Sequence, residues 1–192
     1  LTVELPGIPY EKIEDFKAFI AQEGMVTGGT GSRVRPVVAC KGTTCVFGLY
    51  DTQALAKEIH DRFYVGYAGV TLPHKFKIAV GGCPNNCVKP DLNDLGIIGQ
   101  KVPEVNLEKC RGCKKCQIVE NCPIHVPQVA DGKVLIDPEK CNHCGRCVGK
   151  CPLHAVDSYT SGYRIYIGGR WGKHVAQGRY LDKIFTDKQE VL

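Results

Sequence analysis

The stretch Cys141-Asn-His-Cys144-Gly-Arg-Cys147-Val-Gly-Lys-Cys151-Pro152 is the second of two neighbouring copies of one cysteine pattern. The first copy reads Cys110-Arg-Gly-Cys113-Lys-Lys-Cys116 and continues to Cys122-Pro123. It has five residues before its last cysteine, where the second copy has three. Residues 108–110 align with 139–141 at an offset of 31, and residues 123–125 align with 152–154 at an offset of 29. The two extra residues explain the difference in offset, and we expect them in a surface loop.

The spacing C-x2-C-x2-C-x3-C-P is that of bacterial ferredoxins with two [4Fe–4S] clusters. Three thiolates on one tight loop can hold three corners of a cubane, and the fourth ligand then comes from the other copy. The proline after each fourth cysteine ends the short turn. We therefore predict two clusters with crossed ligands, one held by Cys110, Cys113, Cys116 and Cys151, the other by Cys141, Cys144, Cys147 and Cys122.

Zinc and disulfides are the simpler explanations of so many cysteines. A zinc ribbon uses two C-x2-C pairs and leaves the third cysteine of each copy without a role. A disulfide framework is typical of short secreted chains and rarely contains a C-x2-C-x2-C core. Both explain the pattern less well than iron–sulfur clusters do.

The sequence composition indicates where the protein is located and which classes of partner it lacks. The first residues do not resemble a signal peptide and no apolar run approaches 18 residues, so we expect a cytoplasmic protein without membrane insertion. The formal net charge is +5. An oxidised cluster with four thiolates adds about −2, so three clusters would bring the total to about −1. No arginine-rich run is present, and we expect no nucleic-acid partner.

The N-terminal part predicts one helix and one glycine-rich loop. Apolar residues recur at helical spacing in residues 10–23, at Ile13, Phe16, Phe19 and Ile20, and we expect this face to pack into the core. The loop Gly28-Gly-Thr-Gly31-Ser-Arg33-Val-Arg35 matches neither a Walker A loop nor a dinucleotide fingerprint. It is either a flexible loop with two exposed arginines or a loop that faces an anion.

Short strands and one helix follow in alternation. We predict strands at 37–39, 75–80, 95–98 and 163–167, and a helix at 52–63 with Asp51 as its N-cap. The fold class is therefore α+β, a mixed-sheet domain formed by 1–105 and 161–192, with a ferredoxin-like domain at 106–160 inserted into it. Thr186 with Gln189 predicts a capping box for a last helix, which the end of the sequence at Leu192 cuts short.

Four cysteines lie outside the repeat. Cys40-Lys-Gly-Thr-Thr-Cys45 and Cys83-Pro-Asn-Asn-Cys87 each follow a predicted strand and lie in a glycine-containing turn. Backbone N–H groups in such turns are free to point at sulfur. These two pairs form either a third cluster site or a set of buried free thiols.

The two pairs resemble the siroheme/[4Fe–4S] signature of the sulfite and nitrite reductases. An inserted ferredoxin-like module makes the chain similar to the dissimilatory and anaerobic (small) sulfite reductases. The resemblance covers residues 25–192 and implies a cluster on the four cysteines, with Cys87 also bridging to the siroheme iron. Because siroheme carries many carboxylates, cations should surround it. The candidates are Arg33, Arg35, Lys41, Lys89, Arg170 and Lys173.

Two departures from the family pattern matter. The first pair is C-x4-C where the family usually has C-x5-C, although five chain steps still reach about 17 Å. The family's catalytic unit also has two related halves, and the resemblance implies that the N-terminal half is missing here.

The resemblance implies six-electron reduction of sulfite to sulfide, fed by a separate electron donor. Nitrite reduction, or a non-catalytic electron carrier, are the alternatives. The six histidines show no paired metal spacing and receive no role.

Overall fold

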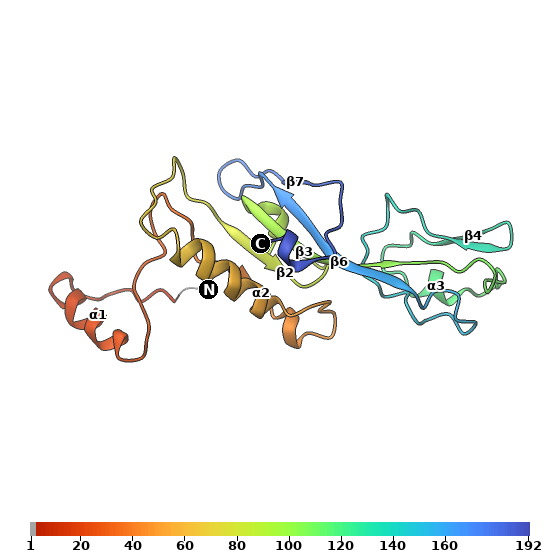
Figure 1. Cartoon of the computed structure of the whole chain (residues 1–192), viewed down its shortest axis with the longest axis horizontal. Helices are drawn as coiled ribbons and strands as arrows, with labels where there is room; N and C mark the ends of the chain where they lie inside the picture. Colours follow the sequence, from red (N-terminus) through yellow and green to blue (C-terminus); the bar gives the residue numbers. More distant parts are fainter. Residues whose placement is uncertain (1–2) are drawn as a thin grey trace.

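The computed structural model describes residues 3–192 as an elongated molecule with three parts in a row (Figure 1). Helix α1 lies at one end, a sheet with helix α2 lies in the middle, and the cysteine repeat lies at the other end. Helices and a mixed sheet alternate as the sequence predicts, and the α+β fold class is confirmed.

The central sheet has the strand order β1-β2-β3-β6-β7. Its strands are β1 (Val38–Ala39), β2 (Ile78–Gly81), β3 (Leu95–Pro103), β6 (Tyr159–Ile167) and β7 (Arg179–Tyr180). The first three run parallel, whereas β6 and β7 are antiparallel to their neighbours. The carboxyl ends of β1 and β2 therefore meet at one edge, where cysteine-containing loops follow both strands.

Strands β3 and β6 are longer than the sequence predicts. They pair without interruption from Leu95↔Ile167 to Pro103↔Tyr159, so the chain leaves the sheet at Pro103 and returns at Tyr159. Phe185 also bridges Tyr163, which ties the segment after β6 to the same sheet. The boundaries 106–160 of a separate inserted domain remain a prediction.

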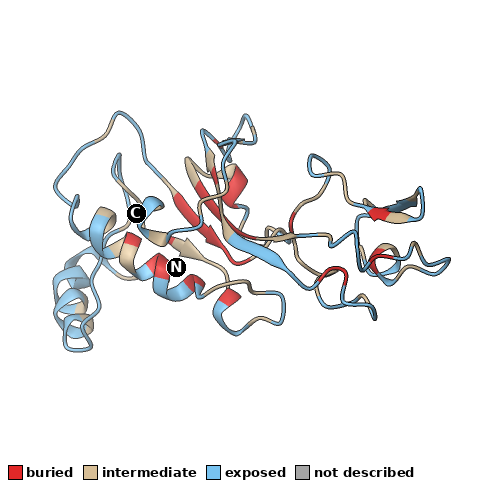
Figure 2. Ribbon diagram, turned by 45° about the vertical axis from the view of Figure 1, so that its right-hand side comes forward, coloured by how far each residue is buried: buried red, intermediate tan, exposed pale blue. Residues whose placement is uncertain are grey.

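Helix α2 (Thr52–Ile59) covers one face of the sheet. The Asp51 carboxylate caps it by accepting a hydrogen bond from the backbone N–H of Ala54, as predicted. Beyond Ile59 the helix widens into a π-helical turn, η3 (His60–Val65). Leu55 and Ile59 pack against buried strand residues, and Figure 2 shows this layer as the main buried region. The core is completed by Val37, Ala56, Ile78, Val80 and Ile97.

The expectation of core packing for the first helix is wrong. A 3-10 turn, η1 (Tyr10–Lys12), leads into α1 (Ile13–Ala21), and neither element has a buried residue. Phe19 is 66% exposed. The reason is position, because α1 lies beyond the end of the sheet and no other described element covers it (Figure 2).

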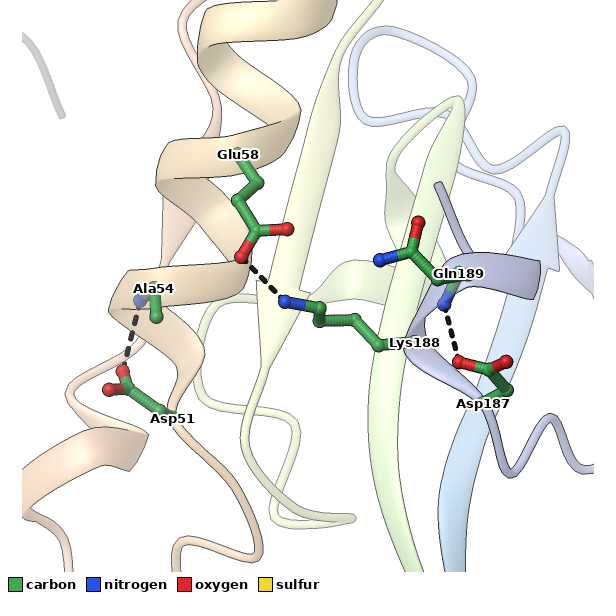
Figure 3. Close-up of polar contacts among 6 residues, drawn as sticks. All are labelled: Asp51, Ala54, Glu58, Asp187, Lys188 and Gln189. Carbon is green, nitrogen blue, oxygen red and sulfur yellow. Dashed lines mark hydrogen bonds and ion pairs between the residues drawn. The ribbon is translucent and has the colours of Figure 1, made fainter.

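The last turn of the chain is capped by a different residue from the one predicted. Asp187, not Thr186, accepts the hydrogen bond from the backbone N–H of Gln189 and begins a 3-10 turn, η5 (Lys188–Glu190) (Figure 3). Lys188 then pairs with Glu58 of α2 at 2.7 Å. This contact ties the C-terminal segment to the helix that covers the sheet.

The repeat forms a second, smaller core. Its elements are the helical turn α3 (Gln117–Glu120) and a hairpin of β4 (Gln128–Ala130) and β5 (Lys133–Leu135). The two extra residues of the first copy lie in α3, not in a surface loop, because Ile118 is 1% exposed and packs into this core. The other buried residues are Cys110, Val134, Ala155 and Val156.

The two copies have matching backbones. The side-chain oxygen of Asn106 accepts hydrogen bonds from the backbone N–H groups two and three residues later, and Asp137 does the same in the second copy. Gly112 and its equivalent His143 both have positive φ, at 57° and 56°. The repeat in the sequence is thus a repeat in conformation.

Candidate iron–sulfur and siroheme site

The first cysteine pair begins where β1 ends. The backbone N–H of Cys40 donates to Val80 of β2 at 3.0 Å, which continues the parallel ladder to the carboxyl edge. The chain then forms a 3-10 turn, η2 (Gly42–Thr44), and reaches Cys45. This compact turn shows how the short C-x4-C loop closes, with Cys45 donating its N–H to the carbonyl of Gly42.

The four cysteines outside the repeat lie together at this edge. Burial raises the pKa of the Cys83 thiol, and the thiols of Cys87, Cys40 and Cys45 raise it further. The backbone N–H of Gly82 donates to the sulfur of Cys40 at 3.1 Å. Converging free thiols with N–H groups directed at sulfur fit the donor set of a [4Fe–4S] cluster.

Close backbone contacts hold the two loops together. A Cβ on Gly42 would lie 3.0 Å from the Cα of Gly82, and a Cβ on Gly99 would lie 2.6 Å from the Gly82 carbonyl oxygen. The buried hydroxyl of Thr52 donates to the Cys40 carbonyl at 2.8 Å. Thr52 at the start of α2 thus contacts the first cysteine loop, and Gly99 in β3 contacts the second.

Asp91 is the buried residue behind the second loop. It lies in a 3-10 turn, η4 (Pro90–Leu92), and its carboxylate accepts hydrogen bonds from Asn86 at 2.6 Å and from Gln177 at 2.8 Å. Asn86 lies between Cys83 and Cys87 with φ 56°, and its own Oδ1 is buried without a partner. An unpaired acceptor beside Cys87 fits a loop that contacts a further group. Cys87 is the one exposed thiol of the four, so its sulfur is accessible to a siroheme iron.

The structure brings Cys122 of the first copy to the cysteines of the second. Burial raises the pKa of the Cys147 thiol to about 11, and the thiols of Cys141, Cys144 and Cys122 contribute to this increase. The backbone N–H of His143 donates to the Cys141 sulfur at 3.4 Å. All four cysteines line one small cavity, which agrees with crossed ligation.

The other set lies around the second core. Cys110 is buried and packs with Cys116 and Cys151, while Cys113 is exposed. Burial works against ionisation of Cys110, but backbone N–H groups of Gly112 and Val134 and the charge of Lys133 lower its thiol pKa. Among residues 3–192 all twelve cysteines are free thiols, and no three His, Cys, Asp or Glu side chains are grouped to hold a single metal ion.

Two of the candidate cations flank the Cys40 and Cys83 loops. Lys41 follows Cys40 and Lys89 follows Cys87 by two residues, and both side chains are exposed. Arg33 and Arg35 lie at the opposite, amino ends of the strands. Arg33 donates to the carbonyl of Ala68 and Arg35 to that of Gly29, and Arg35 lines an open hollow of about 350 Å³ with Lys75 and Lys77.

The remaining two candidate cations lie in the loop after β6. Arg170 exchanges backbone hydrogen bonds with Ala176, and Lys173 lies at the exposed tip between them. The base of this loop packs on the η4 turn, where the N–H of Gly178 donates to the Asp91 carbonyl at 2.7 Å. The structure therefore divides the six candidate cations among three places.

Sequence reasoning missed a buried polar group between the sheet and the repeat. The Nδ1 of His143 lies 3.2 Å from Oε1 of Gln100 in β3 and 3.3 Å from a guanidinium nitrogen of Arg164 in β6. Burial, assisted by the Arg164 charge, lowers the pKa of His143. The repeat alignment gave a usable signal, because His143 occupies a position that is glycine in the other copy.

Comparison with known families agrees with the cysteine geometry. Residues 30–192 match the family model described as the nitrite and sulphite reductase 4Fe-4S domain. The chain belongs to this family, and the resemblance predicted from the two cysteine pairs is confirmed.

Individual relatives agree with this family, and one solved structure shares the fold. The chain is 40% identical over 186 residues to the coenzyme F420-dependent sulfite reductase of Methanocaldococcus jannaschii, covering 96% of this chain and 29% of that protein. It is 28% identical to the beta subunit of the dissimilatory-type sulfite reductase of Archaeoglobus fulgidus, covering 83% and 47%. The fold is similar to the crystal structure of dissimilatory sulfite reductase I, with a TM-score of 0.63 and 22% identity over 92% of this chain and 47% of that one. The chain thus spans less than half the length of these proteins.

No helix among residues 3–192 is both long and apolar enough to cross a membrane.

Proposed function

We propose that the chain is the cluster-binding part of a siroheme-dependent sulfite reductase. The observation that carries this proposal is the position of the Cys40–Cys45 and Cys83–Cys87 loops, which follow the paired strands β1 and β2 at one sheet edge, next to the repeat of eight cysteines. Sulfite is proposed as the substrate because both named relatives are sulfite reductases.

Siroheme, when bound, supplies the redox-active iron on which sulfite is reduced to sulfide with six electrons. The chain's own part is to hold clusters and to orient their ligands. Cys87 would be a ligand of one cluster and would hold the siroheme beside it, while Asn86 and Asp91 keep its loop in place. The Cys110 and Cys141 sets would hold two clusters that deliver electrons from a separate donor.

Among the candidate cations, Lys41 and Lys89 are proposed to face the siroheme carboxylates, because they flank the cysteine loops. Arg33, Arg35, Arg170 and Lys173 remain proposed contacts of the same cofactor or of the second half of the catalytic unit. A partner half is proposed because the match covers only 29% and 47% of these relatives.

The test is a count of cofactors on residues 1–192 and on a protein that also has the second half. We expect iron and acid-labile sulfide for three clusters on the shorter chain, with little siroheme and no sulfide production from sulfite. The longer protein should show a chlorin band in the visible spectrum and reduce sulfite. Stoichiometric siroheme with turnover on residues 1–192 alone would contradict the need for a second half. A longer protein with clusters but no chlorin band would favour an electron carrier.

A further inference from the structure

Strand β3 places two cysteine loops side by side. Gly81, two residues before Cys83, pairs with Ile98, and Cys144 bridges Lys101. The Lys101 N–H donates to the His143 carbonyl at 2.8 Å. Three residues of extended strand span about 10 Å. Because β6 occupies the other edge of β3, the Cys83 and Cys144 loops lie along the same edge at this short separation.

One hollow separates the two loops. It has a volume of about 220 Å³, and both Cys83 and Cys144 line it. Gly145, with φ 67°, lies against Lys101, where a Cβ would come within 2.5 Å of the lysine side chain. Only glycine lets the second loop lie this close to β3.

Arg146 is the side chain that connects the two loops. Its guanidinium carbon lies 4.3 Å from the ring centroid of Phe47, which follows Cys45 by two residues. Its Nη2 lies 3.5 Å from Oδ1 of Asn85, between Cys83 and Cys87. A planar, permanently charged guanidinium can stack on an aromatic ring and bond an amide oxygen at the same time. One residue of the repeat thus contacts both loops of the other cysteine set.

We infer that the cluster of Cys141, Cys144, Cys147 and Cys122 is the immediate electron donor to the Cys83 cluster, and that Arg146 is the positioning residue for this contact. The inference rests on the proposed function for the presence of the clusters. Electrons would then enter at the cluster of Cys110 and cross to the second cluster before they reach the sheet edge. Each step moves one electron, oxidising one cluster and reducing the next.

The other copy of the repeat supplies a matched control. Lys115 occupies the position equivalent to Arg146, and among residues 3–192 it makes no side-chain hydrogen bond or cation–π contact. Both residues are cations in a C-x2-C loop. Substituting each by alanine removes the same charge, but only one substitution removes a contact between loops.

The experiment uses cluster-loaded protein with Arg146→Ala, Arg146→Lys or Lys115→Ala. Electron paramagnetic resonance measures how much the Cys83-cluster signal broadens when the clusters of the repeat are also reduced. Rapid mixing measures how fast the Cys83 cluster is reduced. We expect Arg146→Ala to keep its iron but lose the broadening and slow the transfer about tenfold or more, since small misplacements have large rate effects. Arg146→Lys should recover part of both, and Lys115→Ala should match the unsubstituted protein.

Unchanged broadening and rate in iron-replete Arg146→Ala would overturn the inference, as would an equal loss in Lys115→Ala. If Arg146→Ala loses iron, Phe47→Leu removes the ring partner from the opposite side, and the same two outcomes apply. The proposed function can fail separately. An unsubstituted protein with normal broadening but no siroheme or sulfite reduction would reject that function and leave the cluster order standing. Absence of broadening in the unsubstituted protein would reject the cluster order whatever the activity.

Discussion

The carboxylate of Asp91 accepts a hydrogen bond of 2.6 Å from the side-chain amide of Asn86, which lies in the middle of the Cys83–Cys87 loop. Asp91 is 5% exposed, and its second oxygen accepts from Gln177 of the loop after β6. Asp91, which is not a cluster ligand, thus supports the left-handed backbone conformation of Asn86. Three segments of the chain meet at this carboxylate.

Replacement of Asp91 by alanine should destabilise the protein and loosen the Cys83–Cys87 loop. The change removes the acceptor of the half-buried Asn86 amide, and a donor left unpaired in this way costs up to about 1–3 kcal/mol. We expect a lower denaturation midpoint and a preferential loss of iron from the Cys83 site. Asp157→Ala is the control. Among residues 3–192 that carboxylate pairs only with the exposed His154, so the change should alter stability by about 0.5 kcal/mol or less. Equal effects of the two variants would contradict the role of Asp91.

Thr52→Val tests the support of the first cysteine loop. Thr52 is fully buried, donates to the Cys40 carbonyl and accepts the Thr43 N–H at 3.3 Å. Valine has nearly the same shape but no hydroxyl, so stability should fall by about 1 kcal/mol. Thermal unfolding measures the change. Thr44→Val, at an exposed position of the same loop, should leave the transition where it is.

Gly99→Ala should disturb the contact between β3 and the second cysteine loop. The added Cβ would lie 2.6 Å from the Gly82 carbonyl oxygen and 2.8 Å from the Tyr50 ring. Overpacking of this kind costs about 1–3 kcal/mol. Gly69→Ala has open space around its Cβ and is the control. Chemical denaturation should separate the two variants, and a neutral Gly99→Ala would show that the strand can shift without cost.

Crossed ligation predicts a specific pattern of iron loss. If Cys122 and Cys141 hold the same cluster, Cys122→Ala and Cys141→Ala should each lose about four irons, and the double variant should lose no more. Combining Cys122→Ala with Cys110→Ala should remove about twice as much. Iron and acid-labile sulfide per chain are the measurements. Additive losses for Cys122 with Cys141 would show that each copy holds its own cluster.

The parts of the fold that depend on local patterns could be predicted from the sequence. Asp51 caps its helix, and the short strands lie where alternation and apolar runs place them. The spacing of the cysteines identified the family, because few other roles of cysteine require this spacing. These signals act over a few residues, and tertiary contacts did not override them.

The predictions that failed depended on surroundings. The apolar face of α1 has helical spacing, but spacing does not say whether another element covers that face. The two extra residues of the first copy belong to the helical turn α3, whose Ile118 is buried in the second core. The role of Arg33 and Arg35 stays a prediction, although both lie at the amino ends of the strands, away from Cys40. Asp91 gave no signal, because its partners Asn86 and Gln177 are 91 residues apart in the chain.

The uninterrupted pairing of β3 with β6 has a consequence for modularity. Pro103 and Tyr159 are directly opposite each other at the last pair of the ladder. Opposed residues of an antiparallel pair are about 5 Å apart. A turn of a few residues could therefore replace the whole excursion between them. In the topology of the sheet, the repeat takes the place of a hairpin turn. An architecture of this kind can therefore gain or lose the cysteine repeat without altering the order of its strands.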